Sequence, residues 1–136
     1  MIFVDTSGWA ALLIHSDENN AAAMRWRAQN RSRLLTTDFV IDETLTLLQA
    51  RGHAQRAIEF GDLLFGTANI AHVHMISDAE FMAAWDLFRT FVDKEWSFTD
   101  CTSYVVMQRL GIGAALAFDR HFHQFGTVRV LPDASS

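Results

Sequence analysis

Two aspartates stand where an α/β enzyme would carry reactive groups. Asp5 directly follows the apolar segment 1–4, and Asp119 directly follows the apolar segment 115–118. Short apolar runs of this kind predict strands that are buried on both faces of a parallel sheet. Such sheets form their sites beyond the carboxyl ends of the strands. We therefore expect both carboxylates to reach one site at the same edge of a sheet.

Two further acidic positions lie near the starts of predicted helices. In the helix over residues 40–48, a step of ~100° per residue places Glu43 slightly nearer the apolar face than Asp42, and the small margin leaves both open. Asp100 follows Ser97 by three residues, which is the spacing of a capping box with Asp in place of the usual Glu or Gln. Each acid also has an ordinary interpretation as a turn, cap or solvated residue, so only their combination is informative.

Four carboxylates that converge on one place point to a metal ion. Their charges repel one another, and burial would protonate some of them unless a cation were present. An all-carboxylate, water-filled site selects a hard ion such as Mg²⁺ or Mn²⁺. Such ions can activate water and relieve charge on phosphoryl oxygens.

The elements that must position these acids alternate along the chain. Strands followed by helices or helix pairs predict an α/β fold with a mostly parallel sheet covered on both faces. The predicted strands are residues 1–4, 34–37, 70–76, 115–118 and 128–131. The predicted helices are a short one over 9–15, one capped by 16–18 that runs to 31, one capped by Asp38 over 39–50, and others over 54–65, 77–91 and 97–111.

Composition limits the classes of protein that the chain can belong to. It has 136 residues, half of them hydrophobic and 20% charged, which excludes a disordered protein and suits one domain. We expect that domain to span residues 1–132, with a short polar tail over 133–136. Its 16 acids outnumber its 11 bases, for a net charge of −5. This balance argues against general electrostatic coating of DNA, but not against nucleic acid held locally by metal ions.

Cys101 is the single cysteine, so no disulfide can form within the chain, as suits the reducing cytoplasm. No activating base stands beside it, and it is interpreted as a small buried residue rather than a nucleophile. The apolar run 9–14 is too short to span a membrane, and no signal peptide is recognised. We therefore expect a cytoplasmic protein that does not contact membranes.

Taken together, these segments resemble the PIN-domain ribonucleases, and among them the VapC-type toxins of toxin–antitoxin pairs. The resemblance covers nearly the whole chain and is strongest in residues 96–101 and 117–122. The match favours Glu43 over Asp42 as the acid of the helix after the second strand. The matching pieces are residues 3–7, Glu43, residues 96–101 and residues 117–122.

The resemblance implies a three-layer α/β/α sandwich and an acidic metal pocket formed by Asp5, Glu43, Asp100 and Asp119. It implies Mg²⁺- or Mn²⁺-dependent endonucleolytic cleavage of a structured RNA of the translation machinery, such as tRNA or rRNA. It also implies a protein antitoxin as partner and a homodimer. We expect Asp5 and Asp100 to be the main metal ligands. Glu43 and Asp119 would be further ligands or acids that orient water.

Three neighbouring residues are candidates for contact with the substrate. Thr6 or Ser7 could hydrogen-bond a carboxylate or a phosphate from the turn, or could instead cap the first helix. Arg120, next to Asp119, is placed to touch a phosphate.

Other polar clusters have plainer explanations. His72 and His74 would share one side of a strand, but no third ligand for zinc is evident. The four arginines over 25–33 are interpreted as a solvated face near a helix C-terminus rather than an RNA-binding patch. His121 and His123 are candidates for substrate contact or, more commonly, for hydrogen bonding within their loop.

Two alternatives to a nuclease remain open at this point. One is a catalytically silent PIN-like module that binds RNA or protein, although acids at all four positions argue against it. The other is a small metal-dependent phosphatase. Phosphatases with an aspartyl nucleophile carry a second Asp two residues after the first, and Ser7 occupies that position here.

Overall fold

The computed structural model describes residues 1–134 and contains a parallel five-stranded sheet in the order β3-β2-β1-β4-β5. The strands are β1 (Ile2–Val4), β2 (Leu34–Thr37), β3 (His72–His74), β4 (Ala114–Leu116) and β5 (Arg129–Leu131). The helices are α1 (Thr6–Leu13), α2 (Asn20–Gln29), α3 (Asp38–Ala50), α4 (Ala54–Phe65), α5 (Asp78–Thr90), the 3₁₀ turn η1 (Val92–Lys94), α6 (Phe98–Leu110) and α7 (His121–Gln124).

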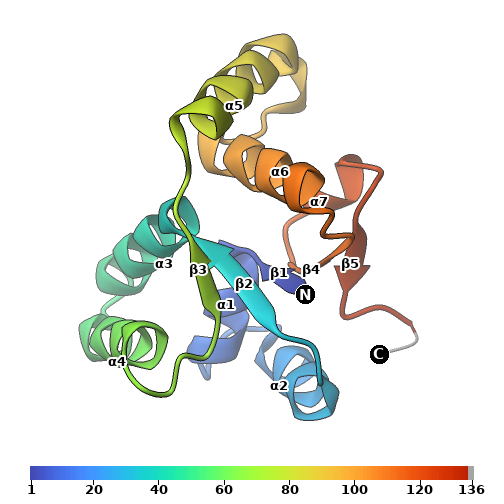
Figure 1. Ribbon diagram of the computed structural model, residues 1–136. Coiled ribbons are helices and arrows are strands. Elements are labelled where there is room, and N and C mark those ends of the chain that lie inside the picture. The colour runs from blue at the N-terminus through green and yellow to red at the C-terminus, as the bar shows by residue number, and fades with distance from the viewer. Residues whose placement is uncertain (135–136) are drawn as a thin grey trace.

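Helices lie on both sides of the sheet, with α3 and α4 at one side and α6 and α7 at the other (Figure 1). The predicted α/β/α sandwich is thereby confirmed. The central strands are buried apart from their first residues, and Phe3, Val4, Ala115 and Leu116 have no exposed surface. Their continuous apolar sequence follows from cover on both faces.

Two strands end earlier than the sequence predicts because backbone amides beyond their ends hydrogen-bond side chains instead of a neighbouring strand. β4 ends at Leu116, and the Phe118 amide donates to Ser7 Oγ at 2.9 Å instead of continuing the ladder. β3 ends at His74, and the Ile76 amide donates to Asp38 Oδ1 at 3.0 Å. Asp119 therefore lies on a loop beyond its strand rather than at the strand's end.

The helix caps were predicted with mixed success. The residue that caps α3 is Thr37, whose hydroxyl accepts from the Val40 amide, rather than Asp38. The cap predicted at 16–18 is wrong, because α2 begins only at Asn20. The expected starts of α5 and α6 are confirmed, since Ser77 and Ser97 each form a complete capping box.

Gly8 lets α1 pack directly against the end of β4. A Cβ atom at this position would lie 2.4 Å from the carbonyl oxygen of Leu116, which is closer than any side chain can approach backbone. The absence of a side chain therefore allows the turn that carries Asp5 and Ser7 to sit against the loop that carries Phe118 and Asp119.

No helix within residues 1–134 has the length and apolar character needed to cross a bilayer. Of the tail predicted over 133–136, residues 135 and 136 lie outside the described part of the chain.

Candidate metal centre

Asp5 is placed by the junction of β1 and α1. It is the residue that caps α1, and its side chain is 3% exposed. Asp5 Oδ2 accepts a hydrogen bond of 2.9 Å from Ser7 Oγ. Its other oxygen, Oδ1, is buried and has no hydrogen-bond partner among the described residues. A buried carboxylate oxygen without a donor is energetically costly unless a ligand satisfies it.

The pKa of Asp5 also indicates that its buried charge has too few hydrogen-bond donors. Burial, with the nearby charge of Asp100, raises the pKa of its carboxyl to about 7, and hydrogen bonds from Ser7 and the Thr6 amide only partly oppose this rise. Two buried carboxylates that disfavour each other's ionisation are the arrangement that a divalent cation stabilises.

Asp100 lies in the first turn of α6 and is 5% exposed. Its Oδ2 accepts from the Ser97 amide at 3.1 Å, completing the capping box, and hydrogen-bonds His121 Nδ1 at 2.9 Å. Burial raises the pKa of Asp100 despite these two contacts. Asp100 therefore takes part in the capping box of α6 and is also a member of the acidic cluster.

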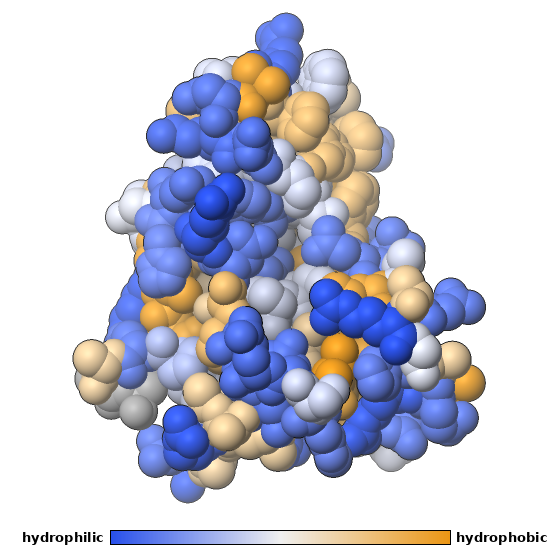
Figure 2. Space-filling view, turned by 180° about the vertical axis from the view of Figure 1, so that it is seen from behind, coloured by the Kyte–Doolittle hydropathy of each residue, from blue (hydrophilic) through white to orange (hydrophobic). Residues whose placement is uncertain are grey.

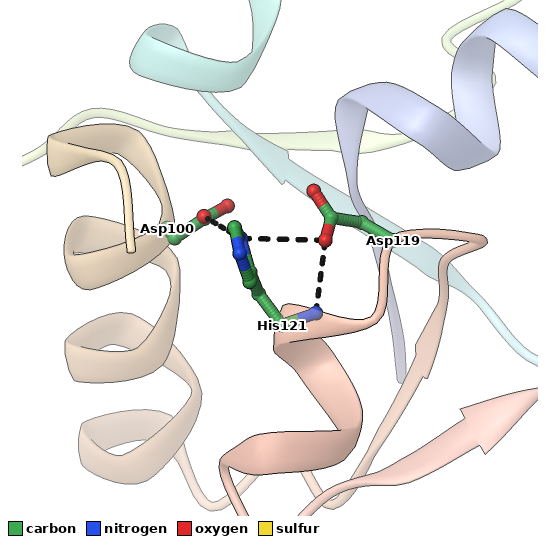
Figure 3. A group of neighbouring side chains, drawn as sticks. All are labelled: Asp100, Asp119 and His121. Carbon is green, nitrogen blue, oxygen red and sulfur yellow. Dashed lines mark hydrogen bonds and ion pairs between the residues drawn. The ribbon is translucent and has the colours of Figure 1, made fainter. Parts of the chain in front are cut away.

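The imidazole of His121 lies between two carboxylates that come from different elements (Figure 3). Asp119, on the loop after β4, accepts from the His121 amide at 2.9 Å, and its Oδ1 lies 3.3 Å from His121 Nδ1. Ligand atoms of Asp100, Asp119 and His121 all fall within 4.8 Å of one another. Sequence reasoning missed this bridge to Asp100. Its only signal was a histidine two residues after a candidate acid.

A hollow of about 280 Å³ opens beside these acids. Glu43 is half-buried in its wall, whereas Asp42 is exposed and is not part of the lining. The structure thus brings Asp5, Glu43 and Asp119 to one cavity, whereas Asp100 is not among its lining residues. The lining residues are Asp5, Thr6, Ser7, Ala10, Asp17, Asn19, Glu43, Leu47, Arg51, Phe118 and Asp119.

The three candidate substrate contacts have different surroundings. Ser7 Oγ donates to Asp5 and accepts from the Phe118 amide, so it ties the first turn to the loop before Asp119. Thr6 lines the hollow, and its buried hydroxyl has no partner within residues 1–134. Arg120 is exposed just before α7 and lies outside the lining of the hollow.

The donors at this site fit a hard divalent cation. Carboxylate oxygens dominate, one imidazole is within reach, and Asp5 Oδ1 is a buried oxygen that no donor within residues 1–134 satisfies. Oxygen-rich sites of this kind select Mg²⁺ or Mn²⁺ over softer metals. The residues present are therefore able to hold such an ion.

The remaining polar candidates lie elsewhere. His74 hydrogen-bonds Glu80, and within residues 1–134 His72 and His74 belong to no group of three metal ligands. Burial, with the charge of Asp100, raises the pKa of the Cys101 thiol to about 11, which makes this residue a poor nucleophile.

Comparison with known proteins places these residues in a family. A family model described as the PIN domain matches residues 2–128. The chain belongs to the PIN-domain family. Two curated relatives, both called 23S rRNA-specific endonuclease VapC20 and found in two strains of Mycobacterium tuberculosis, are 37% identical over 133 residues. Each match covers 98% of this chain and the whole relative.

Solved structures agree with the family assignment. The crystal structure of M. tuberculosis VapC20, described as a sarcin–ricin loop cleaving toxin, superposes with a TM-score of 0.88 at 34% identity and covers 96% of this chain and 98% of its own. FitAcB from Neisseria gonorrhoeae shares the fold, with a TM-score of 0.64 at 13% identity and 96% of each chain covered. The predicted family, fold and nuclease class are confirmed by these comparisons.

Proposed function

We propose that this PIN-domain protein is a metal-dependent endoribonuclease that hydrolyses phosphodiester bonds in structured RNA and acts as the toxin of a toxin–antitoxin pair. The observation that carries the proposal is the pair of buried carboxylates, Asp5 and Asp100, beside a hollow that Glu43 and Asp119 also reach. No arginine or lysine within residues 1–134 forms an ion pair with any of these four acids.

Each residue of the site has a distinct part in this proposal. Asp5 and Asp100 are the main ligands of a Mg²⁺ or Mn²⁺ ion, and Glu43 and Asp119 bind it from the open side or orient water. When bound, the ion supplies an activated water and offsets charge on the phosphoryl and leaving oxygens. Ser7 holds the Asp5 carboxylate in place at 2.9 Å, which fixes the geometry before substrate arrives.

For the substrate, we propose a stem-loop of ribosomal RNA of the sarcin–ricin type. The relatives named for 23S rRNA match 98% of this chain, and the VapC20 structure superposes over nearly all of it. A reaction on ribosomal RNA takes place where translation occurs, so the proposal places the protein in the cytoplasm. Thr6 and Arg120 remain candidate contacts to this RNA.

A protein antitoxin and a homodimer are also part of the proposal. Exposed apolar side chains support protein partners, because isolated proteins seldom leave large apolar patches in water. Figure 2 shows hydrophobic side chains in the upper part of the molecule, where α5 lies. The exposed large hydrophobic residues on α4 and α5 are Ile58, Leu63, Phe65, Phe81, Met82 and Trp85. Light scattering of the purified chain, alone and with the product of an adjacent small gene, tests both partners.

The function is tested with purified protein and a stem-loop RNA. We expect cleavage with Mg²⁺ or Mn²⁺ and none with EDTA. Expression should arrest growth, and Asp100→Asn should relieve the arrest. Equal toxicity of the variant and the wild type would contradict the proposal. Absence of both cleavage and metal binding at millimolar concentrations would support the non-catalytic PIN-like module instead.

A further inference from the structure

The hollow beside the acids has one basic residue in its wall. The hollow is lined at intervals of four residues by Glu43 and Leu47 of α3 and by Arg51, the C-cap residue that directly follows this helix. Side chains with this spacing share one face of a helix. The face therefore runs from an acid near the proposed metal to a guanidinium at the helix end.

Arg51 has no competing partner in the described part of the chain. Its side chain is exposed, and it forms neither an ion pair nor a side-chain hydrogen bond with residues 1–134. Asp17 lines the same hollow but does not pair with it. Arg56, the next arginine along the chain, is instead occupied by Glu59 at 3.0 Å. The guanidinium of Arg51 is thus available to an external anion.

The distance from the acids indicates which anion this is. Eight residues of α-helix separate Glu43 from Arg51, or about 12 Å along the helix axis at 1.5 Å per residue. A phosphate held by the metal at the acids would lie at the Glu43 end of this face, whereas Arg51 lies at its other end. A neighbouring phosphate on the same strand, lying along the hollow, is within its range.

We propose that Arg51 binds a backbone phosphate that flanks the cleaved bond and thereby seats the RNA strand along α3. The inference rests on the proposed ribonuclease function and deepens it. The contact is a charge-assisted hydrogen bond from a guanidinium to phosphate. It lowers the KM for RNA while leaving the chemical step at the acids unchanged, and it is not specific for a base.

The experiment compares Arg51→Gln with Arg27→Gln in steady-state cleavage of a stem-loop RNA with Mg²⁺. Arg27 is a matched control because it is also exposed near the C-terminus of a helix, α2, but does not line the hollow. We expect Arg51→Gln to raise KM about tenfold, as loss of one charged hydrogen bond does, with kcat within about twofold. The slope of log KM against log salt should fall by roughly 0.7–0.9, the value for one phosphate contact. Arg51→Lys should retain most of that slope.

The outcomes separate the inference from the function on which it rests. A wild-type chain that cleaves no RNA overturns the proposed function and the inference with it. A wild-type chain that cleaves, with Arg51→Gln and Arg27→Gln giving the same KM and salt slope, overturns the inference alone. A purely structural role of Arg51 at the helix end would lower the melting temperature without changing the salt slope, and this result also overturns it.

Discussion

Two carboxylates in this protein are almost equally buried but differ in their surroundings. Glu80, on α5, is 2% exposed and accepts from the Ser77 amide at 2.8 Å, His74 Nε2 at 2.9 Å and Arg109 Nη1 at 2.9 Å. Burial acts to raise its pKa, but these contacts outweigh burial and lower the pKa to about 2. Asp5 is 3% exposed, has Ser7 as its side-chain donor, and has a pKa raised to about 7.

The difference distinguishes an acid whose charge the chain itself compensates from one that we propose to bind a metal ion. The charge of Glu80 is fully compensated by the chain, and its bonds tie β3, α5 and α6 together. The charge of Asp5 is left uncompensated beside a second acid. A fold retains such an arrangement when a ligand completes it, because buried polar groups without partners lower stability. Burial alone would not have distinguished the two residues.

The largest expected effect is the loss of catalysis in Asp5→Asn. Removing one proposed ligand of the ion that offsets transition-state charge should lower kcat by about 10²–10³-fold, measured by RNA cleavage at saturating Mg²⁺. Asp42→Asn is the matched control, because Asp42 is an exposed acid beside Glu43 that does not line the hollow. If both variants lost activity equally, the cluster would have no special role.

Glu80→Gln should lower the stability of the fold and leave catalysis unchanged. Loss of a charged hydrogen-bond acceptor should lower the free energy of unfolding by about 2–3 kcal/mol at pH 7, with kcat unchanged. Because folding lowers the pKa of Glu80, its stabilisation is present above pH 4.5 and is lost as pH falls toward 2. Urea titration measures the change. Glu59→Gln, which removes the exposed pair with Arg56, should change stability by less than about 0.5 kcal/mol.

Asp5→Asn should stabilise the metal-free protein. Folding raises the pKa of Asp5 from 3.8 to about 7, so ionisation disfavours the folded state. This cost is absent below pH 4, grows between pH 4 and 7, and is complete above 7. In EDTA at pH 8, the variant should therefore gain roughly 1–3 kcal/mol over the wild type, and the gain should vanish near pH 4. Thermal melts across this pH range measure the gain in stability. A gain that did not change with pH would contradict the expected cost of ionising Asp5 in the folded state.

The smallest expected effect concerns His121, whose ring joins Asp100 to Asp119. His121→Gln should weaken Mn²⁺ or Mg²⁺ binding by about tenfold, as loss of a group that orients metal ligands does. Calorimetric titration measures this directly. The neighbouring His123, which is exposed, provides His123→Gln as a control. Equal metal affinity in both variants would remove His121 from the site.

Local signals in the sequence were enough for most of the fold. The bounds of β2 (Leu34–Thr37) and α4 (Ala54–Phe65) agree with prediction, and Gly111 ends α6 with a φ of 68° as expected for a helix terminated by glycine. These features depend on residues that are neighbours in the chain. Periodicity and capping rules read such neighbours directly.

The details of the site depend on contacts that no local rule contains. His121 reaches Asp100 across 21 positions, and Ser7 reaches Phe118 across 111. The second contact also explains why the fourth strand was predicted too long. The sequence identified the four acids, and the resemblance grouped them into one site. Only the folded structure shows which carboxylate oxygen has no donor within the described residues and how Glu80 differs from Asp5.

The close approach at Gly8 has a genetic consequence. Any larger residue would collide with the Leu116 carbonyl, push α1 away from β4 and separate Ser7 from Phe118, without altering a single charged group. In a selection for cells that survive expression of this protein, inactivating alleles should therefore arise at codon 8 as well as at the codons for the acids. A neutral glycine would then be as vulnerable a target for escape from growth arrest as the acids that we propose to bind the metal.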